Sequence, residues 1–156
     1  HKIMKKKFLI LIFFFVTQCV GYEPIYSSKE QNFYIDTIST EIDDKISKSI
    51  KKKLNPYTKK NDKEKITLKI NSSKKEKILS KDNKGDPVIL EIEISTNVTI
   101  SFNNDEAKIL KFIEKFSYSN QSNKFEFEQY KKNIEKNLID KIFDKLIFKL
   151  RNINDN

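Results

Sequence analysis

The chain has 156 residues, a formal net charge of +9 and 34% charged residues, with a single cysteine and only two glycines. This length supports one domain with one hydrophobic core, and a lone cysteine excludes a disulfide within the molecule. The sequence has no nucleophile motif, metal-ligand cluster or Gly-rich phosphate loop, and no zinc-finger or RNP pattern. We therefore expect no enzyme activity, no metal, no cofactor and no nucleic-acid partner.

The N-terminal segment has the pattern of an export signal. Lys5, Lys6 and Lys7 stand directly before an unbroken apolar run, Phe8–Val16, which is the order of a basic region and a hydrophobic region in a signal peptide. As a helix this run would rise only about 14 Å, about half of a bilayer core, so it is too short to remain as a membrane span. We predict a signal peptide over residues 1–18, with Met4 as the start residue. Its removal would take away four lysines and lower the net charge from +9 to +5.

The only cysteine, Cys19, lies where the apolar run ends. It is either an unpaired thiol or the residue that bacterial lipoprotein processing converts into an acylated N-terminus. Its position at the expected cleavage point favours acylation, although Gln18 occupies a place where such signals usually have a small residue. We predict a diacyl or palmitate-bearing anchor on Cys19, followed by a lipid-anchored tether over residues 19–32.

The first elements expected after the tether are a strand and a helix. Phe33–Ile38 has strand composition, and Thr40 could cap a helix that ends at Asn55-Pro56. The polar residues 57–64 then read as a loop. The helix stripe consists of isoleucine or leucine at every fourth position, namely Ile42, Ile46, Ile50 and Leu54.

A long hairpin and a third antiparallel strand follow. Ile66–Ile70 alternates as a strand does and continues irregularly to Leu79, after which residues 81–87 have turn composition. The returning strand directs Leu90, Ile92, Ile94, Val98, Ile100 and Phe102 to one side. A short turn, Asn103–Glu106, leads to a strand over Lys108–Tyr118 whose expected core residues are Leu110, Phe112, Phe116 and Tyr118. Glu114 interrupts that side and suggests a bulge.

The last expected element is a helix over Phe125–Leu150. Its stripe is Tyr130, Ile134, Leu138, Ile142, Leu146 and Leu150, widened by Ile139, Phe143 and Ile147. The order is thus β-α-β-β-β-α, which predicts an α+β two-layer sandwich with both helices on one face of a four-stranded mixed sheet. We assign residues 33–151 to this single domain and residues 152–156 to a disordered tail.

The sheet face without helices is expected to show only Glu, Ser, Asn, Thr and Lys. Two interpretations of such a face remain open. It is either an ordinary solvated surface, or it contacts something hydrated such as the polar lumen of an outer-membrane barrel.

A short motif behind the cysteine carries a resemblance. Residues 21–26 read Gly-Tyr-Glu-Pro-Ile-Tyr, which resembles the Cys-Gly-Phe-Arg-Pro-Leu-Tyr start of mature LPS-assembly lipoproteins of the alphaproteobacterial LptE type. Val20 is an extra residue here, and Glu23 stands where that family often has Arg. The order of elements, the Phe-Ser-Tyr at 116–118 and the Asn-Leu-Ile-Asp-Lys-Ile at 137–142 are also similar to that family.

The resemblance implies an outer-membrane, periplasm-facing lipoprotein that plugs the LptD β-barrel, helps the barrel to assemble and assists lipopolysaccharide delivery to the outer leaflet. Its partners would be an LptD-type barrel, lipopolysaccharide and the membrane that holds the anchor. The alternatives are a periplasm-facing envelope lipoprotein of similar fold that binds another partner, and an enzyme with an unrecognised site.

Lysines near the hairpin turn are the candidates for contact with the phosphates of lipid A. Lys81 and Lys84 lie in the turn itself, and Lys74, Lys75 and Lys77 lie just before it. The competing interpretation is that these are solubilising lysines in a lysine-rich chain, because one exposed charge pair contributes only about 0–1 kcal/mol. The general basicity likewise fits either an anionic partner or compositional drift.

Overall fold

The computed structural model describes residues 33–41, 44–60, 62, 64–102 and 107–153. The signal peptide, Cys19, the tether and the Asn103–Glu106 turn lie outside the described residues, and so does Ile42. The elements in chain order are the strand β1 (Phe33–Thr40), the helix α2 (Lys45–Leu54), the 3-10 helix η1 (Asn55–Thr58), the strands β2 (Glu64–Lys81), β3 (Pro87–Phe102) and β4 (Lys108–Ser119), and the helix α3 (Lys124–Arg151).

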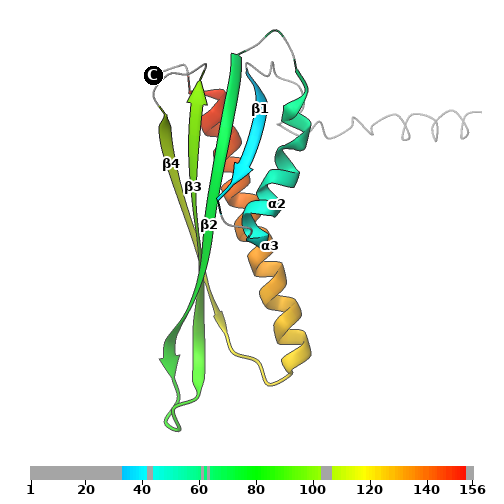
Figure 1. Ribbon diagram of the computed structural model, residues 1–156. Helices are drawn as coiled ribbons and strands as arrows, with labels where there is room; N and C mark the ends of the chain where they lie inside the picture. Colours follow the sequence, from blue (N-terminus) through cyan, green and yellow to red (C-terminus); the bar gives the residue numbers. More distant parts are fainter. Residues whose placement is uncertain (1–32, 42–43, 61, 63, 103–106, 154–156) are drawn as a thin grey trace, which may run out of the picture. The chain divides into compact units, whose positions relative to one another are not determined.

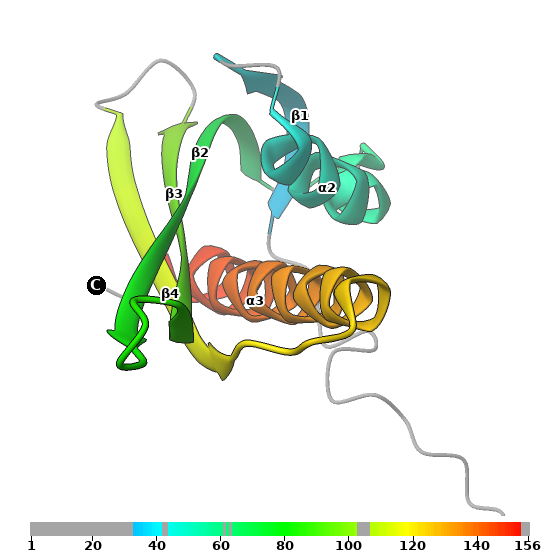
Figure 2. The same ribbon diagram turned by 90° about the horizontal axis from the view of Figure 1, so that it is seen from below.

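The strands form one mixed sheet with the order β1-β2-β3-β4. β1 and β2 are parallel, with α2 in the crossover between them, and β2, β3 and β4 pair antiparallel. Both helices lie on the same face of the sheet (Figures 1 and 2). The predicted α+β two-layer sandwich, with its β-α-β-β-β-α order, is confirmed.

The start of α2 differs from the prediction. Asp44, not Thr40, is the N-cap: its carboxylate accepts a hydrogen bond from the Ser47 N–H at 2.7 Å, which satisfies one of the free N–H groups at a helix start. Thr40 is the last residue of β1, paired with Ile70 of β2. The strand continues two residues beyond Ile38 because this pairing satisfies its backbone.

The β2–β3 hairpin is longer and more regular than expected. β2 has 18 residues and pairs with β3 from Ile66↔Phe102 to Lys81↔Pro87, with its irregularity between Ile78 and Lys81. In β4 the expected bulge at Glu114 is wrong, because the pairing with β3 runs without a shift from Ile89↔Ser119 to Ile100↔Lys108. Glu114 keeps its place by an ion pair with Lys145 of α3.

The apolar core lies between the two helices and the face of the sheet that they cover. Fully buried side chains at its centre come from every layer: Ile35, Ile50, Leu54, Ile66, Leu68, Ile70, Ile92, Ile94, Ile100, Leu138, Ile142 and Leu146. The predicted α3 stripe is thus confirmed over most of its length. The predictions that Tyr130 of α3 and Phe116 of β4 belong to the core are wrong. Their side chains are 37% and 41% exposed, at a groove between the two elements. Ile153, assigned to a disordered tail, packs against the core.

Toward the hairpin turn the helix-facing side of β2 becomes polar. Ser72, Lys74 and Glu76 occupy the positions that Ile66, Leu68 and Ile70 occupy further up the strand, as the period of two requires. Ser72 and Thr96 are both buried and share a hydrogen bond of 3.0 Å. On β2 the buried apolar positions therefore end at this pair, and Lys74 and Glu76 form ion pairs with α3 beyond it. On β3 the buried residues Ile92 and Ile94 continue the core at the same level.

Candidate functional site

The turn that joins β2 to β3 is built around Asp82. Its carboxylate accepts hydrogen bonds from the N–H groups of Lys84, at 2.8 Å, and Asp86, at 2.9 Å. The Asp82 N–H donates to the Asp86 carbonyl and the Gly85 N–H to the Asp82 carbonyl. Gly85 has φ of +87°, a conformation that glycine adopts without steric cost. The predicted turn over residues 81–87 is therefore confirmed, and these hydrogen bonds define its shape.

The two turn lysines are exposed, but their surroundings differ from the expectation. Lys81 and Lys84 alternate with Asp82 and Asp86 within residues 81–87, so the turn carries equal numbers of positive and negative side chains. Neither lysine makes an ion pair with another described residue. The two lysines remain available to an anion, but the field at the tip is weaker than the lysines alone would produce.

Lys74 belongs to a different surface, on the helix side of the sheet. Its ammonium group lies 3.0 Å from the Glu135 carboxylate of α3 and 3.6 Å from Glu76, and the hydrogen bond to Glu135 raises the pKa of Lys74 above its ordinary value. Lys131 joins the same cluster at 3.3 Å from Glu76. Lys74 is therefore engaged in holding α3 against β2.

Lys75 and Lys77 face the opposite, helix-free side of the sheet. Lys77 lies 3.6 Å from the Glu93 carboxylate, which also binds Lys115 at 2.8 Å. The hydrogen bond from Lys115, with a smaller contribution from Lys77, holds the pKa of Glu93 below its ordinary value. The structure thus distributes the five predicted lysines over three surfaces: the turn, the helix side and the free sheet face. It does not bring them together in one cluster.

The free sheet face is polar over β2 and β3. Its central rows are hydroxyl and amide side chains that pair across the strands, namely Thr67, Asn71, Ser73, Ser95, Asn97, Thr99 and Ser101. On β4 the expectation of a wholly polar face is wrong, because Ile109 and Ile113 stand there, 68% and 44% exposed. The sequence contained this information, because the alternation of residues 108–119 places the odd-numbered residues on the sheet face opposite to that of Phe112 and Tyr118.

The stem of the hairpin carries a second apolar group that sequence reasoning missed. Ile78 and Leu79 of β2 and Val88 and Ile89 of β3 lie in the stem next to the turn, and all four are more than a third exposed. At this level Tyr118 of β4, which pairs with Leu90, still belongs to the core, and β4 ends opposite Ile89. We call these four residues the hairpin collar. Exposed aliphatic residues gathered at one level of a hairpin are a candidate contact surface.

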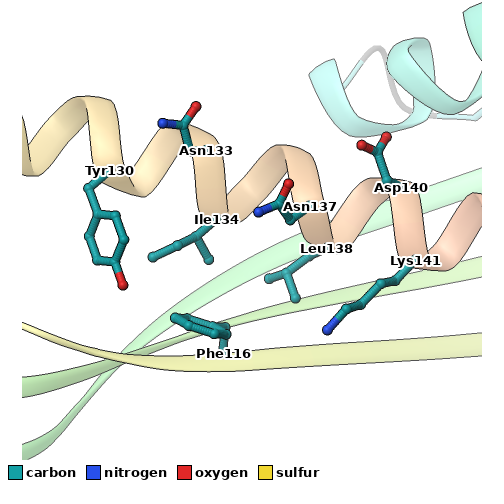
Figure 3. Close-up of a pocket in the computed structure, with 8 residues that line it drawn as sticks. All are labelled: Phe116, Tyr130, Asn133, Ile134, Asn137, Leu138, Asp140 and Lys141. Atoms are coloured by element: carbon teal, nitrogen blue, oxygen red, sulfur yellow. The ribbon is translucent and has the colours of Figure 1, made fainter. Parts of the chain in front are cut away.

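A groove of about 380 Å³ runs between β4 and the exposed side of α3. Phe116 forms its floor on the strand side, across from Ile134 and Leu138, while Asn137 and Lys141 lie along the helix side (Figure 3).

Within the described part of the chain, no three His, Cys, Asp or Glu residues are placed to hold a metal ion. No helix among the same residues is long and apolar enough to cross a membrane.

These features define a class of fold: a two-layer α+β domain with a long projecting hairpin, two helices on one face of the sheet, and a free face that is polar over β2 and β3. No protein-family model matches the sequence, and no curated protein matches it significantly. Solved structures do share the fold, at sequence identities that show the fold alone.

The crystal structure of the rare lipoprotein B from Shewanella oneidensis is similar with a TM-score of 0.63 and 13% identity, over 78% of this chain and 97% of that chain. The solution structure of lipoprotein B from Nitrosomonas europaea is similar at 0.62 and 11% identity, over 79% and 85% of the two chains. A minor lipoprotein from Acinetobacter baumannii is similar at 0.58 and 11% identity, over 79% and 92%. The chain thus has the fold of these lipoprotein structures over most of their length.

Proposed function

We propose that this chain is an outer-membrane lipoprotein, anchored through Cys19 on the periplasmic side, that plugs an LptD-type β-barrel, helps the barrel to assemble and assists lipopolysaccharide delivery. The observation that carries the proposal is the fold, which covers 97% of the rare lipoprotein B structure. The signal-like pattern of residues 1–18 and the position of Cys19 directly behind it support the anchor independently of the fold.

The polar sheet face suits a hydrated partner. The inner surface of outer-membrane barrels is polar, and the Ser, Thr and Asn side chains of β2 and β3 can both donate and accept hydrogen bonds. Most charges on this face are already paired: Glu93 binds both Lys77 and Lys115. A partner that covers this face would therefore remove water from few unpaired charges, so the desolvation cost that opposes binding is small.

The hairpin collar supports a contact with protein. Ile78, Leu79, Val88 and Ile89 are exposed on a hairpin that extends past the beginning of α3 (Figure 1). The charged turn 81–87 lies beyond the collar, so insertion of the tip into hydrocarbon would bury charges at high cost. A protein wall that surrounds the stem would cover the collar and leave the turn in water.

Contact with lipopolysaccharide is assigned to the exposed lysines at this end. Lys81 and Lys84 in the turn and Lys75 on the free face make no ion pair with other described residues, so their ammonium groups can bind lipid A phosphates. Asp82 and Asp86 reduce the attraction, and salt screens it. We therefore propose that these lysines guide the lipid during transfer. No catalytic step is needed for this role.

The test is co-purification of the tagged chain from detergent-solubilised membranes. We expect a stable complex with a large β-barrel, and intact mass spectrometry of the mature chain should find an acylated Cys19. In cells depleted of the barrel, Cys19→Ser should move the chain from the membrane to the soluble fraction, because two acyl chains suffice for stable attachment. An acylated chain that purifies without a barrel would favour an envelope lipoprotein with another partner. An unmodified Cys19 thiol would contradict the anchor.

A further inference from the structure

The outer edge of β4 presents unpaired backbone groups. The Asn120 N–H donates to the Val88 carbonyl at 2.8 Å, and this bonded pair continues the register that begins at Ile89↔Ser119. Because bonded pairs alternate along an antiparallel ladder, the even-numbered residues of β4 bond to β3. The odd-numbered residues turn their N–H and C=O groups away from it: Ile109, Lys111, Ile113, Lys115 and Ser117. β4 is the last strand in the sheet order of the described residues, so this edge is open.

The groove between β4 and α3 runs beside this edge. Phe116 and Tyr130, which the core leaves partly exposed, and the edges of Ile134 and Leu138 line it (Figure 3). An extended peptide that pairs with an open strand directs every second side chain to the same face. A groove beside an open edge is the arrangement in which such added strands gain both backbone bonds and side-chain pockets.

The other face of the same edge is also apolar. Ile109 and Ile113 are exposed there, with Lys111 between them. Side chains of an added strand that do not enter the groove would lie next to these two isoleucines, because cross-strand neighbours on one face are in contact. An added strand with large apolar residues therefore finds apolar partners on both of its faces.

Charge selects among the occupants of this edge. β4 carries Lys108, Lys111 and Lys115 against the single Glu114. Glu114 is bound by Lys145 and Lys115 by Glu93, which leaves Lys108 and Lys111 without an ion pair among the described residues. Lys141 adds a further exposed positive charge at the groove, where the one acidic lining residue, Asp140, is paired with Lys53 at 2.7 Å. A second copy of the chain paired along β4 would place like charges together, which is destabilising. A segment with acidic residues would be attracted.

We propose that the β4 edge and its groove bind an extended segment of a partner protein by strand addition, and that this segment combines large apolar residues with acidic ones. The inference rests on the geometry of β4 and α3, and it stands whether or not the barrel is the partner. Strand addition gives affinity through main-chain hydrogen bonds and selectivity through the groove.

The test uses a fluorescein-labelled peptide of about ten residues that combines Glu with Leu and Phe so that both faces of the extended peptide carry apolar residues. It is titrated into the purified protein and followed by anisotropy. Lys111→Pro removes one outward N–H and spares the ladder with β3, because proline is tolerated on the open side of an edge strand. We expect it to weaken binding about tenfold or more. The matched control Lys111→Ala keeps the N–H and should lose much less. Asn137→Trp, at an exposed helix position, should also weaken binding by filling the groove.

Two further measurements do not depend on the folding of a variant. A peptide methylated on alternate backbone nitrogens should bind at least about tenfold more weakly, and a peptide with Lys in place of Glu should also bind more weakly at low salt. Binding that is insensitive to methylation, or equal for Lys111→Pro and Lys111→Ala, would overturn strand addition. Equal binding of the lysine peptide, or a dimer of the chain through β4, would overturn the choice of an acidic partner segment.

Discussion

The buried hydroxyl pair Ser72–Thr96 offers a quantitative test of the structure, because on β2 it lies between buried isoleucines and leucine on one side and ion-paired residues on the other. The two residues are direct cross-strand partners, are 5% and 0% exposed, and share one hydrogen bond of 3.0 Å. Replacing one partner leaves the other hydroxyl buried without its bond. Such a loss costs about 1–3 kcal/mol, whereas replacing both partners by apolar groups of similar shape is nearly neutral.

Thr96→Val and Ser72→Ala should therefore each lower the free energy of unfolding by about 1–2 kcal/mol, and the double variant should lose less than the sum. The predicted coupling is about 1 kcal/mol, which is within the range for contacting residues. Urea unfolding followed by circular dichroism measures all four proteins, with equal slopes as the control that the unfolded states are comparable. Additive effects, with a coupling below about 0.3 kcal/mol, would show that the two hydroxyls do not depend on each other.

Three further predictions concern the helix face, the free sheet face and the turn. Leu138→Asp should lower the free energy of unfolding by at least about 3 kcal/mol, because it replaces a fully buried side chain with a carboxylate. The control Lys136→Asp, at an exposed position, should change it by about 0.5 kcal/mol or less. Similar melting temperatures of the two variants would mean that the buried face of the helix is misplaced. Because the pKa of Glu93 lies below its ordinary value of 4.5, its contribution to stability is complete above that pH and is lost as the pH falls through the folded-state pKa. Acid titration of stability should show this loss in the wild type and less of it in Glu93→Gln, and identical curves would refute the lysine contacts of Glu93. Changing both Lys81 and Lys84 to Glu leaves only carboxylates among the ionisable side chains of the turn. This double variant should bind lipopolysaccharide more weakly at low salt, with little change in melting temperature. Unchanged binding would show that the turn does not contact lipopolysaccharide.

The order and type of the elements could be predicted from the sequence because their signals are local. The alternation of residues 90–102 and the stripe of α3 each repeat over many residues, so one position out of pattern does not change the assignment. The Asp, Asn, Gly and Pro residues of the turn 81–87 likewise specify a turn by their own backbone preferences. These parts agree with the structure.

The parts that failed depend on which elements meet. Phe116 and Tyr130 follow the apolar pattern but are partly exposed, because they line the groove between α3 and β4. No local pattern in the sequence indicates where such a groove forms. Lys74 and Lys75 are adjacent in the sequence but lie on opposite faces of the sheet, so a cluster in sequence is not a cluster in space. Asp44 caps α2 because Thr40 is still part of β1. The pairing of β1 with β2 sets the end of that strand, and the local sequence does not show this pairing.

The most direct test of the central claim is site-specific photo-crosslinking in living cells from Ser95, which lies in the middle of the free sheet face between Ser73 and Ile113. If the chain is a barrel plug, light should produce an adduct with a large outer-membrane β-barrel, identified by mass spectrometry and lost when that barrel is depleted. Adducts only with soluble periplasmic proteins, or none at all from this position in cells that contain the barrel, would contradict the account.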